Sequence, residues 1–118
     1  MKTVLIVDDS AFMRTILRDI LTNHGYDVVG EAGNGKSGVR KYRELEPDIV
    51  TMDITMDVMN GIEALSRIIG INPNATVIMV TSMGQELILK DAKILGAKGY
   101  IIKPFSETTV IAAFDRIQ

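Results

Sequence analysis

Residues 3–17 read TVLIVDDSAFMRTIL, and this stretch contains both kinds of element from which the fold is built. The segment 3–7 is short and continuously apolar, which is typical of a strand buried on both faces of a parallel sheet. Beyond it, apolar residues recur at steps of three and four, which predicts an amphipathic helix that Ser10 or Asp9 caps and Gly25 ends. The stripe of this helix expected to face the core comprises Phe12, Met13, Ile16, Leu17, Ile20 and Leu21.

The alternation of strand and helix continues along the chain, five times in all. Further strands are predicted at 27–31, 48–52, 76–80 and 99–102. Further helices are predicted at about 36–45, in a stretch that carries Ile62, Leu65, Ile68 and Ile69, in one that stops at Gly96, and after Ser106. The fourth of the five helices is expected to turn Ile88, Ala92 and Leu95 inward. No two strands are joined by a two-residue hairpin turn. Repeated βα units imply an α/β fold, (βα)5, with a doubly wound parallel sheet and helices on both faces.

The composition limits what the protein can be. Its 118 residues fit one domain, 1–118, with enough chain for one hydrophobic core. A net charge of −2 gives no reason to expect nucleic acid or an anionic membrane as a partner. The chain has no cysteine, and no apolar run approaches the roughly 20 residues of a membrane helix. We therefore expect a cytoplasmic monomer that does not insert into a membrane.

Three carboxylates follow predicted strands. Asp8 and Asp9 come directly after the first strand, and Asp53 follows the third. Ligands of open α/β sheets bind outside the carboxyl ends of the strands, so the acids meet there if these two strands are neighbours. Clustered carboxylates repel one another, and Mg²⁺, which prefers oxygen ligands, would relieve that repulsion. The alternative is that Asp8 and Asp9 only cap the first helix. Asp53 argues against it, because a charge at the end of a buried strand is costly unless the site uses it.

Four short motifs resemble one known family. They are VLIVDDSAFMR at 4–14, MDITM at 52–56 with MNG at 59–61, VTS at 80–82, and KPF at 103–105. In this order and at strand ends, they resemble the receiver domains of CheY-type chemotaxis response regulators. The resemblance implies a flavodoxin-like receiver fold with strand order 2-1-3-4-5.

The resemblance also implies roles for the acidic residues. Asp53 becomes the phosphate acceptor, and Asp9 becomes a direct Mg²⁺ ligand. Asp8 acts on the metal mainly through water, and the backbone carbonyl of Thr55 supplies a further ligand. One position departs from the family pattern, because Asp57 stands where these proteins usually have a proline after the methionine. A rigid turn residue is thereby replaced by a carboxylate near the site.

Three further residues acquire roles in the same way. Lys103 supplies a second cation, and in the family its bond to Pro104 is cis. The hydroxyl of Thr81 donates to the phosphoryl group, with Ser82 as a competing hydroxyl, and Tyr100 is the family's rotating aromatic. Each has an ordinary alternative: a solvated surface lysine, and a threonine and a tyrosine chosen for their β propensity.

The resemblance implies a signalling switch, with only weak Mg²⁺-dependent self-phosphorylation and self-dephosphorylation. The expected partners are a chemotaxis histidine kinase, a motor switch protein or adaptor, and a phosphatase. The fourth helix carries more apolar residues than its inward face needs, so either the core stripe is broad or a partner covers the surplus. The expected partner-binding residues are Leu87, Leu89, Ile94 and Tyr100.

Other classes remain open at this stage. The chain could be the receiver of another two-component regulator or of a chemotaxis methylesterase. A flavodoxin-like electron carrier would share the fold, but Asp8 and Asp9 would repel a flavin phosphate.

Overall fold

Five strands alternate with five helices in the computed structural model, which describes residues 1–117. The strands are β1 (Thr3–Val7), β2 (Asp27–Ala32), β3 (Ile49–Asp53), β4 (Val77–Ser82) and β5 (Gly99–Lys103). The helices are α1 (Ala11–Asn23), α2 (Gly35–Leu45), α3 (Gly61–Ile71), α4 (Glu86–Leu95) and α5 (Glu107–Arg116).

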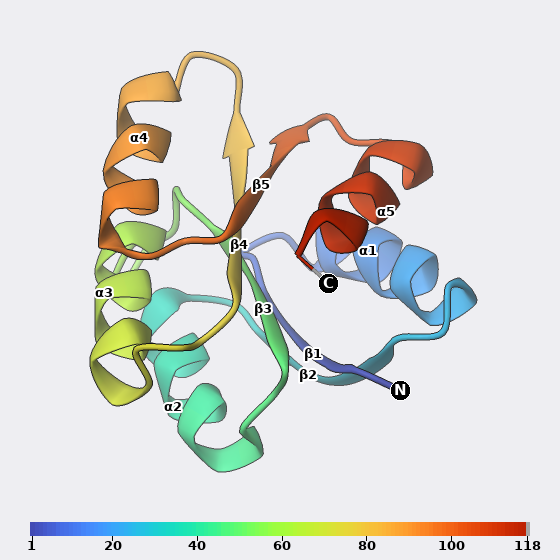
Figure 1. The fold of residues 1–118 in the computed structure, drawn as a ribbon, viewed down its shortest axis with the longest axis horizontal. Helices are drawn as coiled ribbons and strands as arrows, with labels where there is room; N and C mark the ends of the chain where they lie inside the picture. Colours follow the sequence, from blue (N-terminus) through green and yellow to red (C-terminus); the bar gives the residue numbers. More distant parts are fainter. Residues whose placement is uncertain (118) are drawn as a thin grey trace.

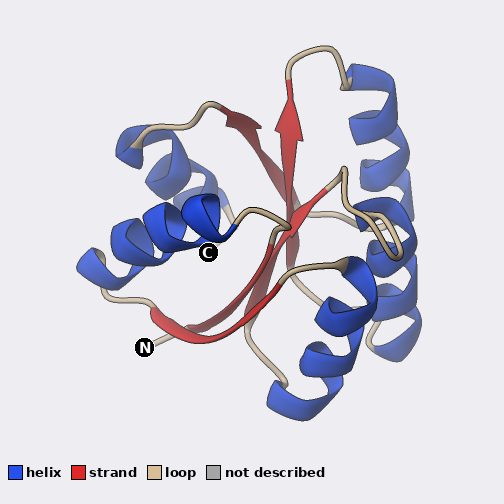
Figure 2. Ribbon diagram, turned by 180° about the vertical axis from the view of Figure 1, so that it is seen from behind, coloured by secondary structure: helices blue, strands red, loops and turns tan. Residues whose placement is uncertain are grey.

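All strand pairs are parallel, and the sheet order is β2-β1-β3-β4-β5. The predicted doubly wound (βα)5 fold and the strand order implied by the family resemblance are thus confirmed. Helices α2, α3 and α4 cover one face of the sheet, and α1 with α5 covers the other (Figures 1 and 2). None of the helices within residues 1–117 is long and apolar enough to span a membrane.

The sheet separates two hydrophobic cores. Alternate residues of β1, such as Leu5 and Val4, point to opposite faces and are fully buried in different clusters. Strands β1, β3 and β4 are buried almost throughout, which is why they read as continuous apolar runs in the sequence. Because these central strands are packed on both faces, the positions of their carboxyl ends, where the acidic residues lie, are held in place.

Helix boundaries follow the expected signals. The Ser10 hydroxyl accepts from the Met13 N–H at the start of α1, and Ser106 caps α5 in the same way. Gly25 lies just past α1 with φ +88°, a conformation that glycine adopts at little cost. Helix α4 ends at Leu95 with Gly96 as its C-cap, where the stop was predicted.

Three residues expected in the core are exposed, two on α4 and one on α1. In α4 the inward residues are Leu89 and Ala92, whereas Ile88 and Leu95 are each more than a third exposed. Ala92 lies four residues after Ile88 and three after Leu89, so helical spacing is compatible with either residue facing the core together with Ala92. On α1 the ring of Phe12 is largely exposed instead of packed, because the first turn lies at the end of the sheet beyond the buried residues Leu17 and Leu21.

Candidate functional site

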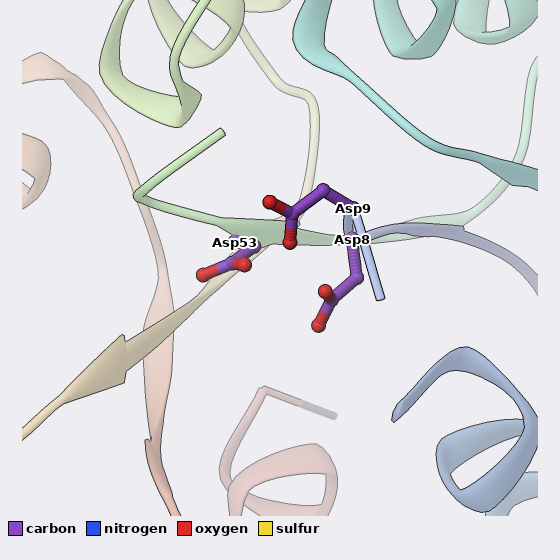
Figure 3. Close-up of side chains that lie close together, drawn as sticks. All are labelled: Asp8, Asp9 and Asp53. Carbon is purple, nitrogen blue, oxygen red and sulfur yellow. The ribbon is translucent and has the colours of Figure 1, made fainter. Parts of the chain in front are cut away.

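The three carboxylates meet at one edge of the sheet. Strands β1 and β3 are hydrogen-bonded neighbours with Val7 opposite Met52, so the residues that follow them lie side by side. Figure 3 shows the side chains of Asp8, Asp9 and Asp53 lying close together at this edge. One carboxylate oxygen from each lies within 4.8 Å of the others. This arrangement offers a cation three negatively charged oxygen ligands.

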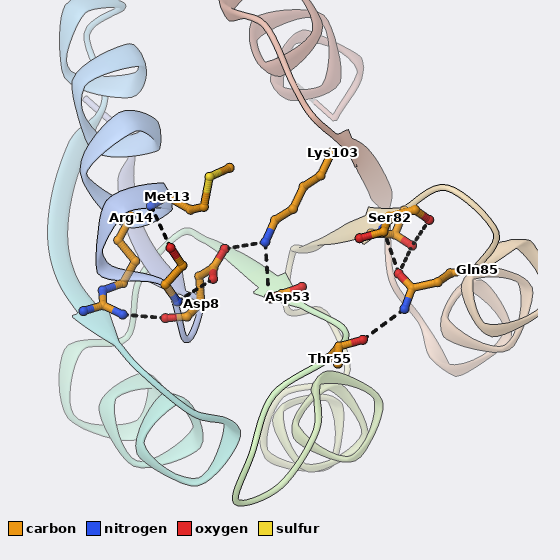
Figure 4. Close-up of polar contacts among 10 residues, drawn as sticks. Asp8, Met13, Arg14, Asp53, Thr55, Ser82, Gln85 and Lys103 are labelled. Carbon is orange, nitrogen blue, oxygen red and sulfur yellow. Dashed lines mark hydrogen bonds and ion pairs between the residues drawn. The ribbon is translucent and has the colours of Figure 1, made fainter.

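A lysine from β5 reaches into this cluster. The Lys103 Nζ lies 2.9 Å from Asp8 Oδ2 and 3.3 Å from Asp53 Oδ2 (Figure 4). The peptide bond between Lys103 and Pro104 is cis. Asp8 and Asp53 are only 5% and 7% exposed, so Lys103 is the counter-ion of two buried acids rather than a solvated surface lysine.

The electrostatics of the site show a shortage of positive charge. Burial and the nearby charge of Asp8 together raise the pKa of Asp53 to about 6, although the neighbouring Lys103 ammonium opposes both effects. Burial lowers the pKa of Lys103, but its hydrogen bond to Asp8 and the charge of Asp53 outweigh this, and that pKa is raised. The ammonium therefore stays charged, and one cation faces three carboxylates.

Asp8 and Asp9 are held differently. Asp8 Oδ1 accepts from the Ser10 N–H at 2.9 Å, and Oδ2 accepts from Lys103, so both oxygens are engaged. The Arg14 guanidinium donates to the Asp8 backbone carbonyl and pairs with Glu31, which fixes the backbone at this point. The exposed Asp9 carboxylate makes no hydrogen bond within residues 1–117. Asp8 is thus oriented in advance, whereas Asp9 can turn toward a ligand.

The loop after β3 approaches the backbone of Asp53 very closely. The Gly61 N–H donates to the Ile54 carbonyl at 2.8 Å. A Cβ at position 61 would lie 2.0 Å from the Asp53 carbonyl oxygen, so only glycine fits there. Between these points Val58 and Met59 have φ of +50° and +71°, in the segment that begins with Asp57. The proline that the family usually has is absent, and the loop contains two left-handed residues that are not glycine.

A glutamine that the sequence analysis did not single out connects two loops of the site. The Gln85 Oε1 accepts from the Thr81 hydroxyl and from the Ser82 N–H, both at 2.7 Å. Its Nε2 donates to the Thr55 hydroxyl at 3.0 Å (Figure 4). No local pattern predicts this bridge, because Thr55 lies 30 positions away along the chain.

The expected partner-binding residues do not form one exposed set. Leu87 and Ile94 on α4 are 81% and 76% exposed, but Leu89 packs against the core. Tyr100 on β5 is half-buried, and the Lys93 Nζ lies 4.9 Å from the centre of its ring. Leu89 is therefore better described as a core residue of α4.

The chain matches known proteins along almost its whole length. The response regulator receiver domain model matches residues 4–115. The chemotaxis protein CheY of Thermotoga maritima is 53% identical over 98% of this chain and 97% of its own. CheY in the CheX–CheY–BeF3–Mg complex from Borrelia burgdorferi superposes with a TM-score of 0.95 at 41% identity, over 98% of this chain and 88% of that chain. A protein-glutamate methylesterase/protein-glutamine glutaminase of Bacillus licheniformis is 44% identical over 91% of this chain but only 30% of its own length. The chain therefore belongs to the response regulator receiver domain family, and within it to the CheY-type regulators of chemotaxis.

Proposed function

We propose that the chain is a switch thrown by phosphorylation of Asp53. The observation that carries this proposal is the place of Asp53, at the end of a central buried strand and within reach of Lys103. A buried carboxylate beside two other acids destabilises the fold. Its presence at this position therefore favours a functional role. Its raised pKa, at about 6, still leaves most of it ionised and nucleophilic near neutral pH.

The proposed reaction is a transfer of a phosphoryl group from a histidine kinase. An Asp53 oxygen attacks phosphorus, an acyl phosphate bond forms, and the bond from phosphorus to the kinase imidazole breaks. Charge in the transition state spreads over the three equatorial oxygens. The Lys103 ammonium, already 3.3 Å from Asp53, is placed to stabilise that charge. The chain would act as a signalling switch and not as an enzyme that turns over a separate substrate. Its own chemistry would be limited to weak self-phosphorylation and self-dephosphorylation.

The donor set fits Mg²⁺. Three carboxylates can each direct an oxygen to one point, and Lys103 neutralises only part of their charge. We assign Asp9 and Asp53 as direct ligands together with the backbone carbonyl of Thr55. Asp8 would act through water, because both of its oxygens already accept hydrogen bonds. When bound, the metal supplies positive charge for the phosphoryl oxygens and relieves repulsion among the acids.

The switch itself would use Thr81 and Tyr100. In the β3–β4 ladder Asp53 lies opposite Val80, so Thr81 stands one residue further along at the same edge of the sheet. Its hydroxyl is suited to donate to a phosphoryl oxygen, and that movement would draw in the loop before α4. Tyr100 lies opposite Met79 on the neighbouring strand and would respond to the rearranged space. Phosphorylation would thus shift the populations of two arrangements of one loop and one ring.

The proposed output face is formed by α4, β5 and α5. The exposed Leu87 and Ile94 give it apolar anchors. A groove of about 350 Å³ beside Tyr100 is bordered by Lys93, Lys98 and Arg116. An acidic segment of a motor switch protein or adaptor, with apolar side chains, fits these features. A phosphatase would instead have to reach the acidic pocket.

Phosphopeptide mapping tests the acceptor assignment. The chain is incubated with Mg²⁺ and acetyl phosphate, and the modified residue is identified by mass spectrometry after trapping. We expect the phosphate on Asp53 and its loss in Asp53→Asn. Asp48→Asn, which changes a carboxylate at the opposite edge of the sheet, serves as the control and should be labelled normally. Full labelling of Asp53→Asn would show that the acceptor is a different residue.

A further inference from the structure

Gln85 makes three hydrogen bonds at the point where the two loops of the site meet. Its side-chain oxygen lies 2.7 Å from both the Thr81 hydroxyl and the Ser82 backbone nitrogen. Its side-chain nitrogen lies 3.0 Å from the Thr55 hydroxyl. Thr81 belongs to β4, Thr55 belongs to the loop after Asp53, and Gln85 is the residue that precedes α4.

The orientation of the Gln85 amide follows from its neighbours. The Ser82 backbone nitrogen can only donate, so the amide atom that faces it must be the oxygen. That oxygen can only accept, so the Thr81 hydroxyl must direct its own proton to it. A second, longer contact of this hydroxyl, 3.3 Å to the Ser82 carbonyl, draws on the same proton. The single donor proton of Thr81 is therefore already in use.

Resting on the function proposed above, we propose that Gln85 is a latch that holds the switch in its resting state. A hydroxyl has one proton, and Thr81 cannot give it to Gln85 and to a phosphoryl oxygen on Asp53 at once. Phosphorylation must therefore break the contact between Thr81 and Gln85. Gln85 is a positioning residue, since it acts on the phosphoryl group only through Thr81.

Release of the latch has a consequence for the output face. When Thr81 turns away, the Gln85 amide keeps the Ser82 N–H and the Thr55 hydroxyl as partners. It loses its hydrogen bond to Thr81, which is the buried one of the three partners. Gln85 directly precedes α4 and makes no side-chain capping bond to that helix. The loss of one of the bonds that position Gln85 therefore changes how the first turn of α4 begins. Leu87 lies in that turn. The latch links the state of Asp53 to the position of an exposed apolar anchor.

The test measures how tightly Asp53 takes up beryllofluoride, a phosphoryl mimic, in saturating Mg²⁺. Amide NMR spectra of the whole chain report occupancy without a partner protein. Gln85→Ala should tighten binding about five-fold, since one net hydrogen bond corresponds to roughly a two- to thirteen-fold change. Gln85→Met, which keeps most of the volume but cannot accept these bonds, should do the same and guards against a packing effect. Ser66→Ala, an exposed polar change on α3, is the control.

The double-mutant cycle with Thr81→Val separates a latch from general support of the loop. A latch requires that Gln85→Ala no longer tighten binding once the Thr81 hydroxyl is gone. The proposal is overturned by unchanged or weaker binding in both Gln85 variants, or by equal tightening in the Thr81→Val background. If the parent chain takes up no beryllofluoride at Asp53, the acceptor assignment and the latch both fall. If the parent binds and the Gln85 variants match it, only the latch falls.

Discussion

Replacing Asp53 by asparagine should stabilise the metal-free protein near neutral pH. The change keeps the shape of the side chain and removes its charge. Burial and Asp8 raise the pKa of Asp53 from 3.8 to about 6. A difference of about 2 pKa units, at about 1.4 kcal/mol each, means that the ionised carboxylate lowers the free energy of unfolding by up to about 3 kcal/mol. The attraction of Lys103 is already included in this pKa, so we expect the variant to gain about 2–3 kcal/mol.

The sign and the pH window follow from linkage. A carboxyl group with a raised folded-state pKa holds its proton longer in the folded than in the unfolded chain. The parent should therefore lose stability as pH rises from about 4 to about 6, whereas Asp53→Asn should not share that loss. The advantage of the variant should be largest near pH 7.5 and should shrink toward pH 4. Mg²⁺ should reduce it, because bound metal stabilises the parent more than the variant.

Urea denaturation followed by circular dichroism, near pH 7.5 and near pH 4 with and without Mg²⁺, measures these differences. Asp48→Asn is a control of opposite sign, since hydrogen bonds from Thr3 lower the pKa of Asp48 and the carboxylate form is the stabilising one. That variant should lose stability near neutral pH. If metal-free Asp53→Asn is less stable than the parent near pH 7.5, or if its gain is independent of pH, the electrostatic account of the pocket is wrong.

Three other predictions concern metal, switch and output. Asp9→Ala should abolish most of the Mg²⁺-dependent rise in melting temperature, which at 100 times the dissociation constant corresponds to ~2.7 kcal/mol; an unchanged rise would place the metal elsewhere. Lys103→Arg should still allow labelling of Asp53 by acetyl phosphate but impair activation of a downstream readout, because the planar guanidinium cannot reproduce the position of the ammonium. Leu87→Ala should weaken binding of the phosphorylated chain to its partner roughly five-fold by loss of apolar contact, without changing labelling. Glu44→Ala on α2 is the control in the same binding assay, and an effect of that variant alone would move the output face to α2.

The fold could be predicted from the sequence because its elements differ in period and are separated by clear signals. The apolar runs of β1, β3 and β4 are continuous since both faces are buried, and Ser10, Gly25 and Gly96 mark helix ends. The acids come together only because β1 and β3 are neighbours in the sheet, and periodicity alone does not predict that pairing. The strand order, however, came from a family resemblance, because periodicity contains nothing about which strands pair.

What failed was the assignment of faces on elements whose sequence is ambiguous. Helix α4 is apolar on several sides, so spacing allowed an inward face with Ile88 or one with Leu89, and only packing against the sheet decides between them. Phe12 has helical spacing but no neighbouring layer to cover it. Gln85 could not be found because its role depends on Thr55, which is distant in sequence and adjacent only in the folded chain.

The close approach at Gly61 affects how mutational surveys of this protein will look. Any side chain there would meet the backbone of Asp53, so a survey scored by signalling should find position 61 about as intolerant as Asp53, the proposed phosphate acceptor. Gly61 nevertheless has no group that could touch a phosphate or a metal. Intolerance to substitution in this pocket therefore does not distinguish residues that take part in the chemistry from residues that leave room for it. A survey scored separately for abundance would separate the two, since Asp53 variants should accumulate normally and Gly61 variants should not.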